Sequence, residues 1–267
     1  MFNEATSPNR CGTVSFVGAG PGAADLITVR GLNLLSQAEV VLYDSLVSAD
    51  LLKNCRADAN LVFVGKRAGL HSIVQSEINN LLVRYASEGR CVVRLKGGDP
   101  TLFGRLGEEI EVLRAACIPY EIIPGVTAAC AAAASAGISL TQRTLATSAI
   151  FVPGHECAGK EDEAKIDWAA LAQANSTLCL YMGVRRLAAV TEQLVAHGLP
   201  LDTPLAVISD VSLSTEKIRT GTLADAAALS AAAEGYPSLI LIGENVRQID
   251  AATVRAIARD RSVSKVR

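Results

Sequence analysis

The chain has 267 residues, of which 50% are hydrophobic, 19% are charged and only 4% are aromatic. This length predicts one large domain or two medium ones, and this composition is typical of a globular protein rather than a disordered one. The formal net charge of −2 gives no global attraction to nucleic acid or to an acidic membrane, and the few aromatic residues argue against a base-stacking surface. We therefore expect neither nucleic acid nor a membrane as a partner.

The seven cysteines are spread along the chain and never form a Cys-x-x-Cys pair. An odd number at this spacing argues against a zinc site and against a disulfide framework, so we expect no metal. No N-terminal segment combines a basic start with an apolar core, and no apolar run reaches the ~18 residues that a membrane span needs. A cytoplasmic protein is the expectation.

The first half of the chain alternates between β-branched runs and segments whose apolar residues recur at helical spacing. The expected elements, in chain order, are a strand at 13–20, a helix at 25–38, strands at 39–47 and 60–69, a helix at 72–89, a strand at 91–98, a helix at 105–116 and a strand at 120–125. Strands separated by helices of about a dozen residues predict a parallel sheet with helices on its faces.

The second half begins with an alanine-rich segment, 126–140, which predicts a closely packed helix rather than a linker. Further strands are expected at 148–156, 176–184, 204–212 and 238–246, with a helix at 185–197 and a hairpin-like segment at 217–223. The prediction is therefore an α/β protein of two domains, 12–125 and 126–247, each a mostly parallel or mixed sheet flanked by helices. The tails, 1–11 and 248–267, are expected to be peripheral.

The sequence "VGAGPGA" matches the dinucleotide-binding pattern G-x-G-x-x-G/A at Gly18, Gly20 and Ala23, between a predicted strand and a predicted helix. Taken alone the match is weak, because glycines also serve tight turns that bind nothing. Pro21 lies where a pyrophosphate would want a backbone N–H, and proline has none. A phosphate-binding loop and a simple tight turn both remain open from these residues.

Charged side chains follow the next two predicted strands. Asp44 comes after Tyr43 at the end of the second strand, and Lys66 and Arg67 follow the third. In open α/β sheets ligands bind outside the carboxyl ends of the strands, so these charges lie where a site is expected. Each of them could equally be an ordinary solvated loop charge, but their recurrence after successive strands favours a site.

The fourth strand end carries "KGGDPTLFGR". Gly97 and Gly98 permit a close approach of backbone to a ligand, and Asp99, held in a turn by Pro100, can present its carboxylate or backbone groups in a fixed direction. Positive charge near this loop is expected from Arg94, Lys96 and Arg105. A fifth strand end turns through Pro124 and Gly125 to Thr127, which can cap the alanine-rich helix or contact a ligand.

The segments "VGAGPG", "YDSLVS", "VGKRAG", "RLKGGDPTLFGR", "IPGVTAA" and "LYMG" occur in this order. In order and spacing they resemble the tetrapyrrole methylase family, and most narrowly its uroporphyrinogen-III C-methyltransferases, over residues 12–247. The resemblance implies that methyl groups pass from S-adenosylmethionine to carbons 2 and 7 of uroporphyrinogen III, giving precorrin-2 by way of precorrin-1 and releasing S-adenosylhomocysteine. It also implies a homodimer whose chains hold the donor in a cleft between two α/β domains.

The resemblance also assigns roles to residues. Asp44 corresponds to the proposed general base, and Lys66 and Met182 correspond to residues implicated in activity. The expected donor contacts are Pro21, Gly97, Gly98, Asp99, Leu102, Thr127, Ala128, Met182 and Val211. The substrate carries carboxylates, so cationic side chains should surround it, and the candidates besides Lys66 are Arg67, Arg105 and Arg143. Met182 could instead be a core residue at a strand end.

Three positions depart from the family pattern. Gln142 stands where histidine is frequent, Val211 replaces a glycine at a usual donor contact, and Leu106 replaces the second glycine after "FGR". A backbone contact to the donor could survive at Val211, and Leu106 narrows the expected substrate entrance. The sequence does not distinguish a product that feeds sirohaem from one that feeds cobalamin.

Three alternatives remain. One is a related methylase that acts on another carbon of a precorrin, which "YDSLVS" and "VGKRAG" argue against. Another is a nicotinamide-dependent oxidoreductase with Glu39 or Asp44 on the ribose, which Pro21 opposes. The last is a non-catalytic protein that binds only the donor, which the presence of Asp44 and Lys66 makes less probable. We expect a dehydrogenase and a chelatase of the same pathway to lie outside these 267 residues.

Overall fold

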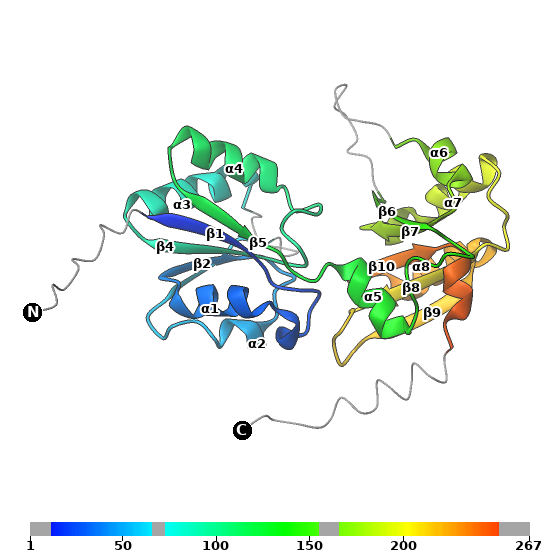
Figure 1. Cartoon of the computed structure of the whole chain (residues 1–267), viewed down its shortest axis with the longest axis horizontal. Coiled ribbons are helices and arrows are strands. Elements are labelled where there is room, and N and C mark those ends of the chain that lie inside the picture. The colour runs from blue at the N-terminus through cyan, green and yellow to red at the C-terminus, as the bar shows by residue number, and fades with distance from the viewer. Residues whose placement is uncertain (1–11, 66–72, 155–165, 251–267) are drawn as a thin grey trace, which may run out of the picture. The chain divides into compact units, whose positions relative to one another are not determined.

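The computed structural model describes residues 12–65, 73–154 and 166–250. The chain divides after Thr127 into two compact units, each with a five-stranded sheet and helices that cover it (Figure 1). One sheet is parallel and the other is mixed. The predicted α/β class, with helix-flanked parallel or mixed sheets, is confirmed.

The sheet of the first unit has the strand order β3-β2-β4-β1-β5, and every pairing in it is parallel. Its strands are β1 (Thr13–Gly18), β2 (Val40–Tyr43), β3 (Asn60–Phe63), β4 (Cys91–Lys96) and β5 (Tyr120–Ile123). Because all of them run in one direction, the loops that follow them meet at a single edge of the sheet. The predicted strand-end residues of this unit that the structure describes therefore share one edge.

Helices cover both faces of this sheet (Figure 1). They are α1 (Val29–Gln37), α2 (Ala49–Leu52), α3 (Gln75–Ser87) and α4 (Leu106–Ala115), and a 3-10 helix spans Ala24–Leu26. The strand residues alternate between two cores, since successive side chains of a strand point to opposite faces. Phe16 packs with Leu82 and Leu113 of α3 and α4, whereas Val17 packs with Leu35 of α1.

The sheet of the second unit has the order β6-β7-β10-β8-β9. Its strands are β6 (Ser148–Pro153), β7 (Ser176–Tyr181), β8 (Pro204–Ser209), β9 (Lys217–Thr222) and β10 (Ser238–Ile242). β6 and β7 are parallel, while β10 runs antiparallel to both β7 and β8. The hairpin-like segment of the sequence forms β9, which pairs antiparallel with β8 at the edge of the sheet.

The helices of the second unit are α5 (Ala128–Ala136), α6 (Trp168–Gln173), α7 (Leu187–Ala196) and α8 (Ala226–Ala233). Short 3-10 helices span Val184–Arg186, Leu223–Asp225 and Glu244–Gln248. The main apolar cluster joins Leu187 and Leu194 of α7 to Leu205 and Ile240 of the sheet. α5 packs against β10, and six of its nine residues are buried. The alanine-rich segment is a packed helix, as its small side chains predict.

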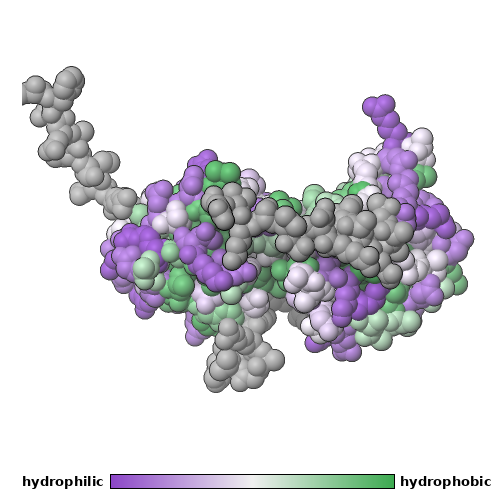
Figure 2. Space-filling view, turned by 90° about the horizontal axis from the view of Figure 1, so that it is seen from below, coloured by the Kyte–Doolittle hydropathy of each residue, from purple (hydrophilic) through white to green (hydrophobic). Residues whose placement is uncertain are grey.

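On the face seen in Figure 2, hydrophilic and hydrophobic side chains are interspersed. The large apolar side chains that are exposed come from separate elements, as Val29, Val74 and Leu201 illustrate. Single exposed apolar residues are ordinary on a protein surface. In the part of the chain that the structure describes, the helices are too short or too polar to cross a membrane.

Candidate active site

Three glycines from three strand ends pack against one another at the carboxyl edge of the first sheet. Gly18 ends β1, Gly98 follows β4 and Gly125 follows β5. A Cβ atom on Gly18 would lie 2.6 Å from the Cα of Gly125, and one on Gly125 would lie 2.3 Å from the carbonyl oxygen of Gly98. Larger side chains do not fit at Gly18 and Gly125, because the backbones of the three strand ends pack directly against one another there.

Gly20 and Gly98 exchange two backbone hydrogen bonds. The N–H of Gly98 donates to the carbonyl of Gly20 at 2.7 Å, and the N–H of Gly20 donates to the carbonyl of Gly98 at 3.2 Å. The N–H of Ala19 donates to the carbonyl of Lys96 at 2.8 Å, and Pro21 has no N–H to offer. The loop from Ala19 to Pro21 therefore has no free N–H for a pyrophosphate, which argues against a dinucleotide site.

Glu39, one of the two acidic residues that a dinucleotide site could use, lies just before β2, at the opposite edge of the sheet. Its carboxylate accepts a hydrogen bond from the N–H of Cys91 at 2.8 Å and lies 3.6 Å from the guanidinium of Arg90. A ribose held near the glycine loop would lie at the other end of the strand. Glu39 is thus a structural residue at the amino edge of the sheet.

The carboxylate of Asp99 ties two strand ends together. One oxygen accepts a hydrogen bond from the N–H of Gly125 at 2.9 Å, and the other accepts from the N–H of Thr101 at 2.8 Å and from the hydroxyl of Thr101. Asp99 therefore fixes the loop after β4 against the loop after β5. Its contact with a methyl donor stays a prediction, and the geometry adds a structural role that the sequence did not indicate.

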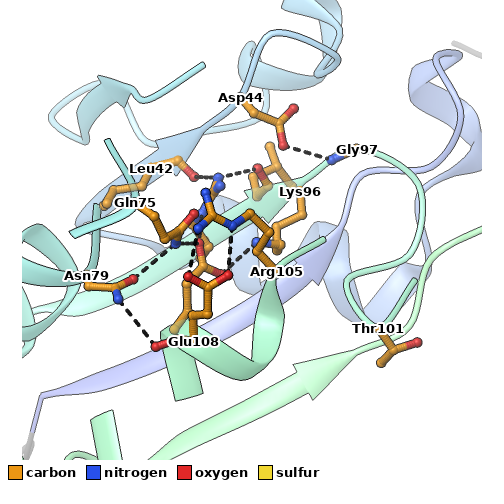
Figure 3. A network of polar contacts seen from close by, with 12 residues as sticks. Leu42, Asp44, Gln75, Asn79, Lys96, Gly97, Thr101, Arg105 and Glu108 are labelled. Atoms are coloured by element: carbon orange, nitrogen blue, oxygen red, sulfur yellow. Dashed lines mark hydrogen bonds and ion pairs between the residues drawn. The ribbon is translucent and has the colours of Figure 1, made fainter. Parts of the chain in front are cut away.

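Asp44 follows β2 and holds the neighbouring strand end. One carboxylate oxygen accepts from the N–H of Leu46 at 3.1 Å. The other accepts from the N–H of Gly97 at 3.3 Å, as Figure 3 shows. The side chain is only partly buried. A carboxylate fixed in this way at the site edge can accept a proton from a bound molecule, provided that the molecule comes within hydrogen-bonding reach.

Two of the predicted site residues, Lys66 and Arg67, lie outside the described residues. The chain is described as far as Gly65, two residues beyond β3. A Cβ atom on Gly65 would lie 2.4 Å from the backbone nitrogen of Ser45, so the loops after β2 and β3 touch at this glycine. The predicted roles of Lys66 and Arg67 stay predictions.

A buried ionic cluster lies beneath the loop after β4 (Figure 3). The carboxylate of Glu109, on α4, accepts from Nε of Arg94 at 3.1 Å and from Nζ of Lys96 at 2.6 Å, and its side chain is 0% exposed. Arg94 and Lys96 were expected to add positive charge near this loop, but both side chains are buried and paired with Glu109. These side chains lie two residues apart on a strand and point together into the core, where Glu109 pairs with both.

The cluster connects four elements of the first unit. The guanidinium of Arg94 also donates to the carbonyls of Leu42 and Leu95, and Gln75 of α3 donates to Glu109 at 3.2 Å. Burial, followed by the neighbouring Arg94, lowers the pKa of Lys96, while Glu109 raises it in part. Two cations share one carboxylate, so the lower pKa is the expected response to a buried surplus of positive charge.

Arg105 precedes α4 in the left-handed backbone region, with φ at 53°. Its guanidinium donates two hydrogen bonds of 2.7 Å to the carboxylate of Glu108, one turn into the helix. Both side chains are about half exposed. The role of Arg105 in binding a polycarboxylate substrate stays a prediction, and such a substrate would compete with Glu108 for the guanidinium.

Predicted donor contacts gather at the strand ends within each unit. In the first unit, Pro21 adjoins the Gly20–Gly98 pairing, and a Cβ on Gly98 would lie 4.0 Å from the Cα of Thr127. Leu102 follows in the same loop and donates its N–H to the carbonyl of Asp99 at 3.2 Å. The structure therefore brings these backbone positions together at one edge.

In the second unit, Met182 follows β7 and Val211 follows β8. Met182 has a φ of 55° and is 52% exposed, which contradicts its reading as a core residue. Val211 is buried, between two residues with positive φ, Asp210 and Ser212. Backbone held in this uncommon region at two strand ends is typical of functional sites.

Arg143 lies in a tight turn between α5 and β6, and its side chain is exposed. The turn is closed by Gln142, whose N–H donates to the carbonyl of Ala146 at 2.7 Å. The side chain of Gln142 accepts a hydrogen bond from Gln248 at 2.7 Å. In this chain the position that departs from the family pattern thus stabilises the turn that carries Arg143.

The sequence did not single out two residues that fix neighbouring segments. Glu109 pairs with Arg94 and Lys96 in the first unit, and the hydroxyl of Tyr181 accepts a hydrogen bond from the N–H of Ala129 in the second. A signal for Glu109 was present, because two cations at i and i+2 of an otherwise apolar strand need a buried acidic partner. In the described part of the chain, no three His, Cys, Asp or Glu side chains gather closely enough to bind a metal ion.

A family model of the tetrapyrrole (corrin/porphyrin) methylases matches residues 13–227. This chain belongs to the tetrapyrrole methylase family. The resemblance that the strand-end motifs indicate is therefore confirmed, and the described residues of these motifs lie at carboxyl ends of strands in the two sheets.

Curated relatives narrow the comparison. The chain is 51% identical over 236 residues to a siroheme synthase of Actinobacillus pleuropneumoniae, covering 88% of this chain and 48% of that protein. It is 52% identical over 246 residues to a siroheme synthase of Neisseria meningitidis, covering 92% of this chain and 50% of that protein. This tetrapyrrole methylase chain thus spans about half the length of the curated relatives it matches.

Solved structures give the same fold. A cobalt precorrin-4 methyltransferase superposes with a TM-score of 0.79 at 32% identity, covering 90% of this chain and 98% of that one. A uroporphyrin-III C-methyltransferase of Thermus thermophilus, in complex with S-adenosylhomocysteine, superposes with a TM-score of 0.73 at 35% identity, covering 88% and 94%. Both are methyltransferases of tetrapyrroles.

Proposed function

We propose that this tetrapyrrole methylase transfers methyl groups from S-adenosylmethionine to uroporphyrinogen III, at carbons 2 and 7, giving precorrin-2 by way of precorrin-1. The observation that carries the proposal is the Asp44 carboxylate fixed to the N–H of Gly97, beside strand ends whose glycine backbones pack against one another. The 51% identity to a siroheme synthase and the likeness to a uroporphyrin-III C-methyltransferase support it.

The edge of the first sheet suits a donor without phosphates. When bound, S-adenosylmethionine supplies an electrophilic methyl group. A Cβ on Gly98 would meet only the Cα of Thr127, at 4.0 Å, so a ligand can approach the backbone at Gly98 closely, while the loop from Ala19 to Pro21 has no free N–H for a pyrophosphate. We propose that these residues bind the donor, and we propose Met182 and the backbone at Val211 as donor contacts of the second unit.

Asp44 serves the reaction as the acceptor of a proton. A pyrrole carbon of the reduced macrocycle is electron-rich, so the reaction needs alignment more than activation. A proton must leave after the carbon is methylated, and a carboxylate at the site edge can take it. We propose that Lys66, Arg67, Arg105 and Arg143 hold the carboxylates of the substrate.

The proposed reaction is tested by its product. The chain is incubated with S-adenosylmethionine and enzymatically generated uroporphyrinogen III, and the masses of the tetrapyrrole products are measured. The proposal requires the addition of two methyl groups, with a product of one addition appearing first. A substrate that returns unmethylated in the presence of the donor would refute the assignment.

A second candidate is a sister methylase that acts on a later precorrin. The observation that favours it is the TM-score of 0.79 to a cobalt precorrin-4 methyltransferase, against 0.73 for the uroporphyrin-III enzyme. Sequence identity favours uroporphyrinogen III, at 35% against 32%, and so does the 51% identity to a siroheme synthase. Methylation of a precorrin without methylation of uroporphyrinogen III would select the sister reaction.

We predict that the chain binds S-adenosylhomocysteine and does not bind NAD. The reason is the missing N–H at Pro21 and the engaged N–H groups of Ala19 and Gly20. Isothermal titration calorimetry against both ligands measures this. Tight binding of NAD, with no heat from S-adenosylhomocysteine, would return the chain to the oxidoreductase alternative.

We further propose a homodimer, as the family resemblance implies. Sedimentation velocity at micromolar concentration should then give a species of twice the 27.9 kDa chain mass. A single species at the mass of one chain would contradict the proposal.

A further inference from the structure

The hydroxyl of Tyr181 supports the first turn of α5. Tyr181 is the last residue of β7, and its hydroxyl accepts a hydrogen bond from the N–H of Ala129 at 3.1 Å, across 52 residues of sequence. Ala129 is the second residue of α5. The first N–H groups of a helix have no hydrogen-bond partner within the helix, and the hydroxyl of Tyr181 supplies a partner for one of them.

The backbone and ring of Tyr181 are fixed as well. Its carbonyl accepts from the N–H of Gly154 at 2.6 Å, and its ring meets that of Phe151 edge to face, with centroids 6.0 Å apart. A Cβ on Gly154 would lie 2.2 Å from the Cα of Gly183, so the backbones at the ends of β6 and β7 are in direct contact. Tyr181 is therefore a rigid support.

Two of the proposed donor contacts adjoin this support on either side. Ala128 precedes Ala129 at the start of α5, and Met182 follows Tyr181 with its backbone at a φ of 55°. Tyr181 is thus bonded to the start of α5 through its hydroxyl and joined to Met182 along the backbone. Met182 presents a half-exposed side chain from this fixed point.

We infer that Tyr181 is a positioning residue for the methyl donor, whose hydroxyl holds the start of α5 in the geometry that binds the donor beside Met182. The inference rests on the proposed function. Without the hydroxyl, the N–H of Ala129 loses its partner and the first turn of α5 becomes free to fray. Ordering that turn again on binding costs free energy, so the affinity for the donor falls.

The test is the substitution Tyr181→Phe, which removes one oxygen atom and keeps the ring against Phe151. The dissociation constant of S-adenosylhomocysteine, measured by calorimetry, should rise about fivefold, the scale of one neutral hydrogen bond. In methyl transfer the KM for S-adenosylmethionine should rise, while turnover at a saturating donor concentration stays close to that of the unchanged chain.

The matched control is Tyr120→Phe. The hydroxyl of Tyr120 accepts a hydrogen bond from Nε of Arg114 at 3.0 Å. Tyr120 is the first residue of β5, so it lies at the amino end of that strand, away from the carboxyl ends where the site is proposed. Both substitutions remove one hydrogen bond, so a general loss of stability would affect them alike, and only Tyr181→Phe should weaken the donor.

An unchanged dissociation constant for Tyr181→Phe, or an equal rise for both variants, would overturn the inference. A failure of the proposed function is recognised from the unchanged chain rather than from the variants. If the unchanged chain releases no heat with S-adenosylhomocysteine, the proposed function falls, and the positioning role of Tyr181 falls with it.

Discussion

Replacing Asp44 by Asn should lower the rate of methyl transfer to uroporphyrinogen III by about 10²-fold or more, the usual scale for a lost general base. The asparagine keeps the size of the side chain and one acceptor oxygen, so it can still accept from the N–H of Gly97 or of Leu46. It cannot take the proton. The affinity for S-adenosylhomocysteine, measured alongside, should stay near that of the unchanged chain.

Asp50→Asn is the matched control, because Asp50 is an exposed carboxylate on α2 that pairs with Lys53 at the surface. Its loss should leave methyl transfer unchanged. If Asp44→Asn also keeps full turnover, Asp44 is only a turn residue that fastens the loop after β4, and another group or water takes the proton. If Asp44→Asn loses donor binding together with turnover, the main role of Asp44 is to hold the loop after β4 in place rather than to accept a proton.

The alternation of strands and helices was predictable from the sequence, because the periods of apolar residues are local. β1 and β4 lie inside the predicted ranges 13–20 and 91–98, and α5 lies inside 126–140. The direction of β10 was not predictable in this way. Its apolar run reads the same whether it pairs parallel or antiparallel with β7 and β8, and direction follows from how the whole chain returns to the sheet.

The site edge was predictable in part. Carboxyl ends of parallel strands meet at one edge, so Asp44 and Gly97 could be expected near each other, and the structure joins them by a hydrogen bond. What local patterns do not reveal is which partner each polar group finds. Asp99 was expected to face a ligand, and its carboxylate binds the backbone of Gly125 and Thr101.

Arg94 and Lys96 show the same limit more sharply. On a sequence they are charges near a glycine loop, and a charge is usually solvated. Their burial depends on Glu109, which is 15 and 13 residues away and becomes a neighbour only when α4 packs on the sheet. A contact of that kind is a property of tertiary packing rather than of the strand.

Replacing Glu109 by Gln should lower the free energy of unfolding by about 3–5 kcal/mol, the scale for removing one partner of a buried ion pair. The side chain of Glu109 is 0% exposed, and its carboxylate is the shared partner of Arg94 and Lys96. Glutamine keeps the shape and leaves the two buried cations without the carboxylate that they share. Urea unfolding followed by far-UV circular dichroism measures the loss as a lower midpoint.

The neighbouring Glu108 provides a control variant, and the dependence of stability on pH tests whether the charge of Lys96 is responsible. Glu108→Gln breaks a half-exposed pair with Arg105 and should cost at most about 1 kcal/mol. Burial and Arg94 already lower the pKa of Lys96 from its usual 10.5, and removing Glu109 removes a group that raises it. As pH rises through this lowered pKa, folded Lys96 releases its proton while the unfolded chain keeps it, so folding becomes more favourable with pH up to about 10.

The free energy of unfolding lost by Glu109→Gln should therefore shrink between pH 7 and about pH 10, whereas that lost by Glu108→Gln should not. Equal losses for the two variants at neutral pH would show that the cluster contributes no more than a surface ion pair.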